Sequence, residues 1–164
     1  MGHLQNLVKR FQCDKIKGWT TYFKFVSIIC AGYSLSAAII IPQPVLRRIF
    51  TWLTAMFYIT SFIFFKTAHL QKMAYAKHLM IILFVFNFIA LLIEPIYAVA
   101  LSLTTPSTKP SLYFVRDVDT TIIITNKIFM FDFFHVVYSF LLYRAANFVI
   151  SARLAEVDPQ LVIP

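Results

Sequence analysis

Charged side chains are scarce in this sequence. Only 13% of its 164 residues are Asp, Glu, Lys or Arg, whereas 60% are hydrophobic. Soluble domains are usually about half apolar and about a quarter charged, so this shortage of charge argues against a soluble domain. The composition predicts an integral membrane protein.

Cysteine is rare, and the common catalytic motifs are missing. Cys13 lies in a basic N-terminal stretch and Cys30 in the first apolar run, so a disulfide framework in external loops is not expected. The sequence has no CxxC, HExxH, GxGxxG or Walker motif. It also has no Ser–His pairing outside the apolar runs. These absences predict a chain without enzymatic activity.

Acidic residues are few, with 7 Asp and Glu against 15 Lys and Arg, which gives a net charge of +8. No block of Lys and Arg is long enough to favour nucleic-acid binding. In a membrane protein, such positive charge is expected to face anionic lipid headgroups.

Four apolar runs are present, and a membrane-spanning helix needs roughly 20 apolar residues. We therefore predict an all-α membrane protein with four transmembrane helices. A basic tail at 1–21 precedes them and is suited to an interfacial helix. A loop at 104–127 separates the last two helices, and a C-terminal tail occupies 151–164. The predicted transmembrane domain covers 22–150, with helices at about 22–41, 49–65, 79–103 and 128–150.

The orientation is predicted from the basic residues, which concentrate on the inner side of a membrane. With both termini inside, ten basic residues lie on the inner side and five on the outer side, so inner termini are favoured. The inner set is Lys9, Arg10, Lys15, Lys17, Lys24, Lys66, Lys72, Lys77, Arg144 and Arg153, and the outer set is Arg47, Arg48, Lys109, Arg116 and Lys127.

The connections between the runs differ in character. Within the loop at 104–127, the stretch SLYFVRDVDTTIIIT is rich in β-branched and aromatic residues, which favours a short strand or hairpin. The basic connection KTAHLQKMAYAKH has no helix breaker and can continue as a helix. Near the C-terminus, Pro159 prevents further helix.

Three ionisable residues lie within the apolar runs. Asp132 and His135 are three positions apart and share a helical face, and Glu94 falls at a similar depth in the predicted bilayer. Two interpretations remain open, a proton or ion relay and a polar clasp between helices. The clasp is favoured because a relay needs a polar route to both surfaces. The three residues do not complete a diiron or haem ligand set, so no metal or cofactor is expected.

Small residues and basic residues form two further patterns. A stripe of small residues on one helical face predicts close packing against another helix, either in this chain or in another subunit. It consists of Ser27, Ala31, Ser34 and Ala38. Residues near the ends of the runs either set the topology or hold an anionic phospholipid such as cardiolipin. They are Arg47, Arg48, Trp52, Lys66, Lys72 and Lys77.

The layout resembles that of lysosome-associated four-span transmembrane proteins. The shared features are a basic second connection, a longer loop before the last span, and the closing stretches VVYSFLLYRAANFV and VDPQLVIP. The sequence departs from that family in its N-terminal segment, where only Cys13 represents a cysteine-rich region. The tyrosine-based tail motifs of the family are absent. The resemblance implies inner termini and covers topology more than motifs.

The function predicted from these features is that of a non-catalytic accessory subunit in a larger membrane complex. The favoured host is an energy-transducing complex of the mitochondrial inner membrane, such as a respiratory-chain complex or ATP synthase. Its expected partners are other membrane subunits and anionic lipids. One alternative is a stand-alone trafficking or lipid-binding protein of endolysosomal or plasma membranes, and another is a small ion or proton conductor.

Overall fold

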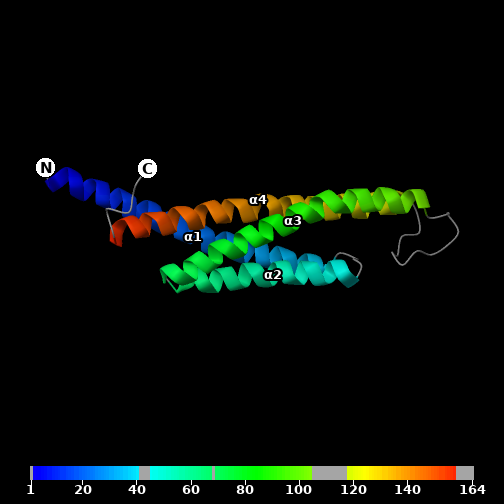
Figure 1. The fold of residues 1–164 in the computed structure, drawn as a ribbon, viewed down its shortest axis with the longest axis horizontal. Coiled ribbons are helices and arrows are strands. Elements are labelled where there is room, and N and C mark those ends of the chain that lie inside the picture. The colour runs from blue at the N-terminus through cyan, green and yellow to red at the C-terminus, as the bar shows by residue number, and fades with distance from the viewer. Residues whose placement is uncertain (1, 41–44, 68, 105–117, 158–164) are drawn as a thin grey trace.

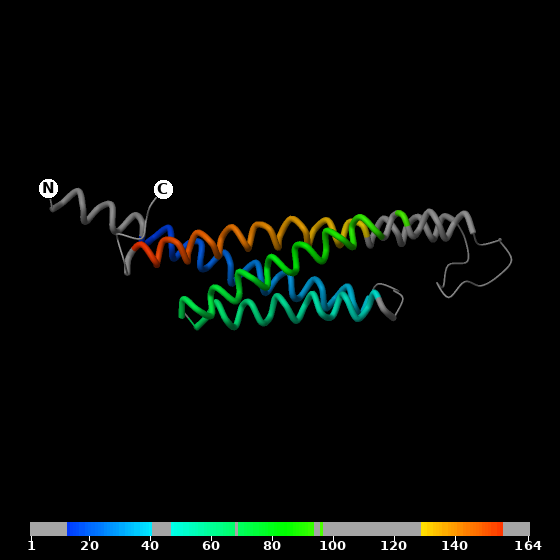
Figure 2. The backbone as a smooth tube through the Cα atoms, in the orientation of Figure 1, coloured from blue at the N-terminus to red at the C-terminus, as the bar shows by residue number. Residues whose placement is uncertain are grey.

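The computed structural model consists of four long helices in the part of the chain that it describes. They are α1 (Gly2–Ile40), α2 (Val45–Lys66), α3 (Leu70–Thr104) and α4 (Val118–Val157). The backbone is described at 2–40, 45–67, 69–104 and 118–157, and the side chains at 13–40, 47–67, 69–93, 96 and 129–155, as Figures 1 and 2 show.

Each helix contains a segment that is long and apolar enough to cross a membrane. These segments are Cys13–Ile40, Arg47–Lys66, Leu70–Ile93 and Phe129–Ala155. The prediction of an all-helical chain with four membrane-spanning candidates is therefore confirmed. Four such helices suggest an integral membrane protein, whereas the side on which the termini lie stays a prediction.

The helices pack as a bundle in which helices that are consecutive in the sequence lie next to each other. Helix α1 packs against α2 and α4, and α3 packs against α2 and α4. Figure 1 shows α3 crossing obliquely, with its first part beside α2 and its later part beside α4. Stacked rings of Phe23 and Phe65, with centroids 3.9 Å apart, join α1 to α2. Phe84 and Phe140, with centroids 5.8 Å apart, join α3 to α4.

The helices begin and end outside the apolar runs. Helix α1 is continuous from Gly2, so the predicted tail at 1–21 and the first span form one helix. No proline interrupts the chain before Pro42, and helical hydrogen bonding therefore continues through the polar stretch. Helix α4 continues to Val157, two residues before Pro159, whose ring disfavours a helical residue directly before it.

The predicted loop at 104–127 is shorter in the structure, because α4 already begins at Val118. The stretch from 118 to 125 is thus helical, not part of a strand or hairpin. β-branched residues favour strands only where a neighbouring strand packs beside them. In the connection after α2, that helix ends at Lys66 and α3 begins at Leu70, so the stretch is helical from 70 onwards. The amide of Met73 donates to the carbonyl of His69 at 2.9 Å.

Candidate functional site

His135 lies at the centre of the bundle and contacts side chains from two other helices. Its own helix is α4, and its ring is fully buried. Its Nε2 lies 3.1 Å from the Ser34 hydroxyl of α1, and its Nδ1 lies 3.1 Å from the Tyr58 hydroxyl of α2. Three helices therefore meet at one imidazole, and both of its nitrogens take part in hydrogen bonds.

The direction of each hydrogen bond follows from counting protons. The Ser34 hydroxyl donates its one proton to the carbonyl oxygen of Cys30, at 2.8 Å. It must therefore accept from His135, which places the ring proton on Nε2. The bare Nδ1 then accepts from the Tyr58 hydroxyl. This assignment gives a neutral histidine with every polar atom of the ring satisfied.

The hydrogen bonds form a chain across three helices. The Tyr58 hydroxyl donates to His135, His135 donates to Ser34, and Ser34 donates to the carbonyl of Cys30. We call Cys30, Ser34, Tyr58 and His135 the His135 network. All four residues are fully buried. Buried polar groups are costly unless they are hydrogen-bonded, and in this network each supplies the partner that another needs.

Aromatic rings enclose the imidazole. The ring centroids of Phe131 and Phe134 lie 4.3 and 5.3 Å from that of His135, both edge to face. Tyr33 of α1 approaches at 5.7 Å. Edge-to-face packing of this kind contributes about 0.5–1.5 kcal/mol per pair beyond the buried area. The imidazole is thus held by packing as well as by hydrogen bonds.

A second polar contact joins α2 to α4 one turn away from His135. The Arg47 guanidinium donates to the Asp132 carboxylate in an ion pair. The Asp132 side chain is fully buried, and that of Arg47 is 11% exposed. The guanidinium also lies 5.5 Å from the centroid of the Phe131 ring, a cation–π geometry. The pair therefore neutralises the buried carboxylate.

The predicted site residues fall into three groups. Asp132 and His135 are buried together, and their described contacts go to α1 and α2. The side chain of Glu94 lies outside the described residues, so its part in a clasp stays a prediction. All residues of the small stripe are buried inside the chain: Ser27, Ala31, Ser34 and Ala38.

The predicted headgroup residues divide between the interior and the surface. Arg47 pairs with Asp132 inside the bundle. Arg48, Lys66 and Lys72 are exposed, and Trp52 is 44% exposed. Lys77 is half-buried and donates to the Asn147 amide oxygen at 3.4 Å.

Sequence reasoning missed Tyr58 and the pairing of Arg47 with Asp132. Tyr58 carries no signal of its own, since the chain has 8 tyrosines. The ion pair had a signal, because Arg47 and Asp132 are opposite charges near the same predicted side of the membrane. The structure also buries Asn87, whose amide nitrogen donates to the Leu83 carbonyl at 2.8 Å.

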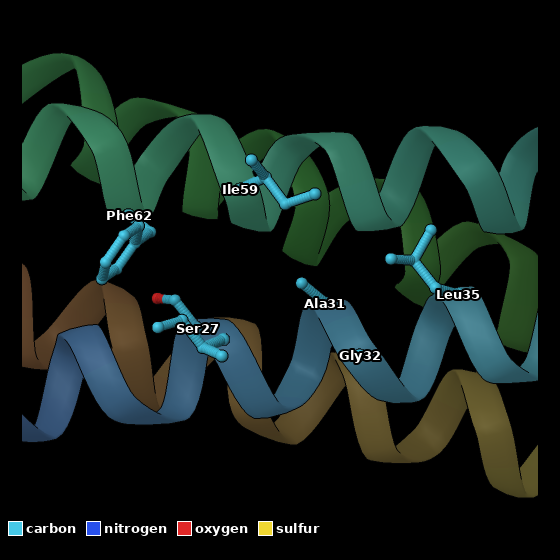
Figure 3. Close-up of a pocket in the computed structure, with 7 residues that line it drawn as sticks. Ser27, Ala31, Gly32, Leu35, Ile59 and Phe62 are labelled. Atoms are coloured by element: carbon cyan, nitrogen blue, oxygen red, sulfur yellow. The ribbon is translucent and has the colours of Figure 1, made fainter.

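A surface groove lies between α1 and α2 in the described part of the chain. Its volume is about 350 Å³. Figure 3 shows Ala31 and Leu35 of α1 on one side, with Ile59 and Phe62 of α2 on the other. The lining consists of Ser27, Ile28, Ala31, Gly32, Leu35, Ile59 and Phe62.

The described residues include no cluster of three or more His, Cys, Asp and Glu side chains arranged to hold a metal ion. The side chains of the His135 network are instead engaged with one another. A comparison of the chain with models of protein families, with curated proteins and with solved structures found no match.

Proposed function

We propose that this chain is a non-catalytic accessory subunit of a larger membrane complex. The observation that carries the proposal is that the buried polar side chains bind other residues of the same chain. Both nitrogens of His135 and the carboxylate of Asp132 bind residues of the same chain. The groups best suited to chemistry therefore join helices together, which is the work of a structural subunit.

The lengths of the helices also support this proposal. Helices α1 and α4 have 39 and 40 residues, which is about 60 Å of helix at 1.5 Å per residue. The hydrocarbon core of a bilayer is about 30 Å thick. Each helix thus has about as much length outside the core as inside it, and that length is available for contacts with partner subunits.

The proposed host is an energy-transducing complex of the mitochondrial inner membrane. The first 24 residues contain Lys9, Arg10, Lys15, Lys17 and Lys24 but only one acidic residue, Asp14. A basic, acid-poor N-terminus is typical of segments that direct import into mitochondria. In this proposal the segment serves import while it remains part of helix α1.

Photocrosslinking of the full-length tagged chain in its native membrane tests the proposal. A benzophenone amino acid replaces one exposed phenylalanine at a time: Phe25 at 65% exposure, Phe88 at 43% and Phe133 at 49%. Phe23 and Phe65 serve as matched controls, because both are buried and stack on each other. We expect at least one exposed position to form an adduct with another membrane subunit, and the buried positions to form none.

Blue-native electrophoresis in digitonin, followed by mass spectrometry, completes the test. We expect the chain in mitochondrial membranes, migrating with subunits of one complex. Migration as a lone 19.0 kDa species with no adduct at any exposed position would contradict the proposal. Recovery from endolysosomal or plasma membranes would contradict the mitochondrial host.

A further inference from the structure

The groove between α1 and α2 has apolar walls and is open on the outer surface of the bundle. Ile28, at its edge, is 53% exposed. Its one hydroxyl, that of Ser27, donates to the carbonyl of Phe23 at 2.7 Å. The walls therefore offer no unsatisfied polar group, and an occupant must be apolar where it lies in the groove.

Two lysines stand at one end of this groove. Lys24 precedes Ile28 by four residues, and Lys66 follows Phe62 by four residues, so each shares a helical face with a lining residue. Phe23 and Phe65, the residues directly before the lysines, stack with centroids 3.9 Å apart. This stacking fixes Lys24 and Lys66 at the same level of the bundle.

The charges near this end are positive. Lys24 is half-buried and Lys66 is exposed. No ion pair to either lysine is found among the residues that the structure describes. The acidic residues with described side chains are Asp14, ten residues from Lys24 on α1, and Asp132, which binds Arg47. The mouth of the groove thus has two ammonium groups to attract an anion.

We propose that this groove binds an anionic phospholipid, with one acyl chain between α1 and α2 and the phosphate between Lys24 and Lys66. The lining of α1 runs from Ser27 to Leu35, which is about 12 Å of helix. One leaflet supplies about half of a 30 Å hydrocarbon core. The groove therefore matches the depth of one leaflet, with its charged mouth at the headgroup level.

Gly32 keeps the groove open. It is exposed, and a Cβ atom added to it meets no atom within 4 Å. The Cβ of a larger side chain therefore has room at this lining position. We expect the rest of a leucine side chain to take up space in the groove, which makes Gly32→Leu the variant that tests the site. The inference does not depend on the host complex, because the lysines and the groove belong to this chain alone.

Native mass spectrometry of the detergent-solubilised full chain tests the site. The chain is titrated with palmitoyl-oleoyl phosphatidylglycerol and, separately, with the phosphatidylcholine of the same acyl chains. One lysine near an anionic headgroup changes the affinity by about five-fold, and two by about 25-fold. We expect phosphatidylglycerol to bind more tightly by a factor in this range. The double variant Lys24→Gln, Lys66→Gln should bind both lipids equally.

A second double variant controls for loss of charge. Lys77→Gln with Arg144→Gln also removes two positive charges, one from a half-buried and one from an exposed residue, but on α3 and α4. We expect it to retain the preference for phosphatidylglycerol. Gly32→Leu should weaken the binding of both lipids at this site, because it fills the groove, with an unchanged circular dichroism spectrum.

Three outcomes would overturn the proposal. The first is that the unaltered chain binds the two lipids equally. The second is that both double variants lose the preference for phosphatidylglycerol to the same extent. The third is that Gly32→Leu leaves lipid binding unchanged. Dimers that Gly32→Leu converts to monomers, with no effect on lipid, would assign the groove to a second copy of the chain. None of these results depends on whether the chain is a subunit of a complex.

Discussion

Replacing Arg47 by methionine removes the cation that neutralises Asp132. The carboxylate is fully buried and the guanidinium is 11% exposed, so solvent can replace little of the lost contact. Removing one partner of a buried ion pair costs about 3–5 kcal/mol of unfolding free energy. In a chain of 150–250 residues, 1 kcal/mol shifts the melting temperature by about 2–4 °C. We therefore expect Arg47→Met to lower the melting temperature by about 6–20 °C.

The neighbouring residue is the matched control. Arg48 is exposed, and substitutions of exposed residues away from specific contacts change stability by about 0.5 kcal/mol or less. Arg48→Met should therefore shift the melting temperature by about 2 °C at most. The double variant Arg47→Met, Asp132→Leu should recover most of the loss, because apolar residues can replace a buried ion pair at little cost.

The chain contains its own reporter for this measurement. Cys30 is fully buried and Cys13 is exposed. In a Cys13→Ser background, a fluorogenic maleimide reacts with Cys30 only when the bundle opens, and heating the detergent-solubilised chain gives a melting curve. Equal effects of Arg47→Met and Arg48→Met would refute the buried pair. So would a double variant that is as unstable as the sum of its single changes.

Three further predictions concern the interior of the bundle. In a double-mutant cycle, Tyr58→Phe and His135→Leu should show a coupling of about 0.6–1.7 kcal/mol in unfolding free energy. Strictly additive losses of stability would contradict the hydrogen bond between Tyr58 and Nδ1 of His135. In the unaltered chain, a water-soluble maleimide should label Cys13 and leave Cys30 unlabelled until denaturant is added, and labelling of both in the folded chain would contradict the packing. The clasp predicted from the sequence requires coupling between Glu94→Leu and His135→Leu in the same assay, and additivity there would exclude it.

The four helices could be predicted because each apolar run is about as long as a bilayer is thick. Their ends could not, because hydropathy marks only the apolar part of a helix. The backbone of α1 continues through the polar residues before 22, and α4 continues past 150. Helical hydrogen bonds also form outside the apolar part of a helix. Helices α1 and α4 end at Ile40 and Val157, each two residues before a proline.

The sequence could predict which site residues share a face of one helix, but not which residues of other helices they contact. The spacing of Asp132 and His135 predicts a shared helical face, and in the structure both lie on α4 and are buried. Which helices lie beside that face depends on the arrangement of all four, and no single helix specifies it. The sequence therefore indicates Ser34 only as a packing residue, and Arg47 only as a residue that sets the topology or holds a headgroup. Each has a partner on α4 in the structure.

The His135 network has a specific use in a bundle of this composition. Lipid is as apolar as the side chains it contacts, so burial gives little preference for one sliding position of a helix over another. A hydrogen bond does give a preference, because its partners must lie within about 3 Å. Ser34, Tyr58 and His135 satisfy one another only when α1, α2 and α4 stand at one relative height. The network thus favours one register of three helices, and the stacking of Phe23 on Phe65 is consistent with the same register between α1 and α2.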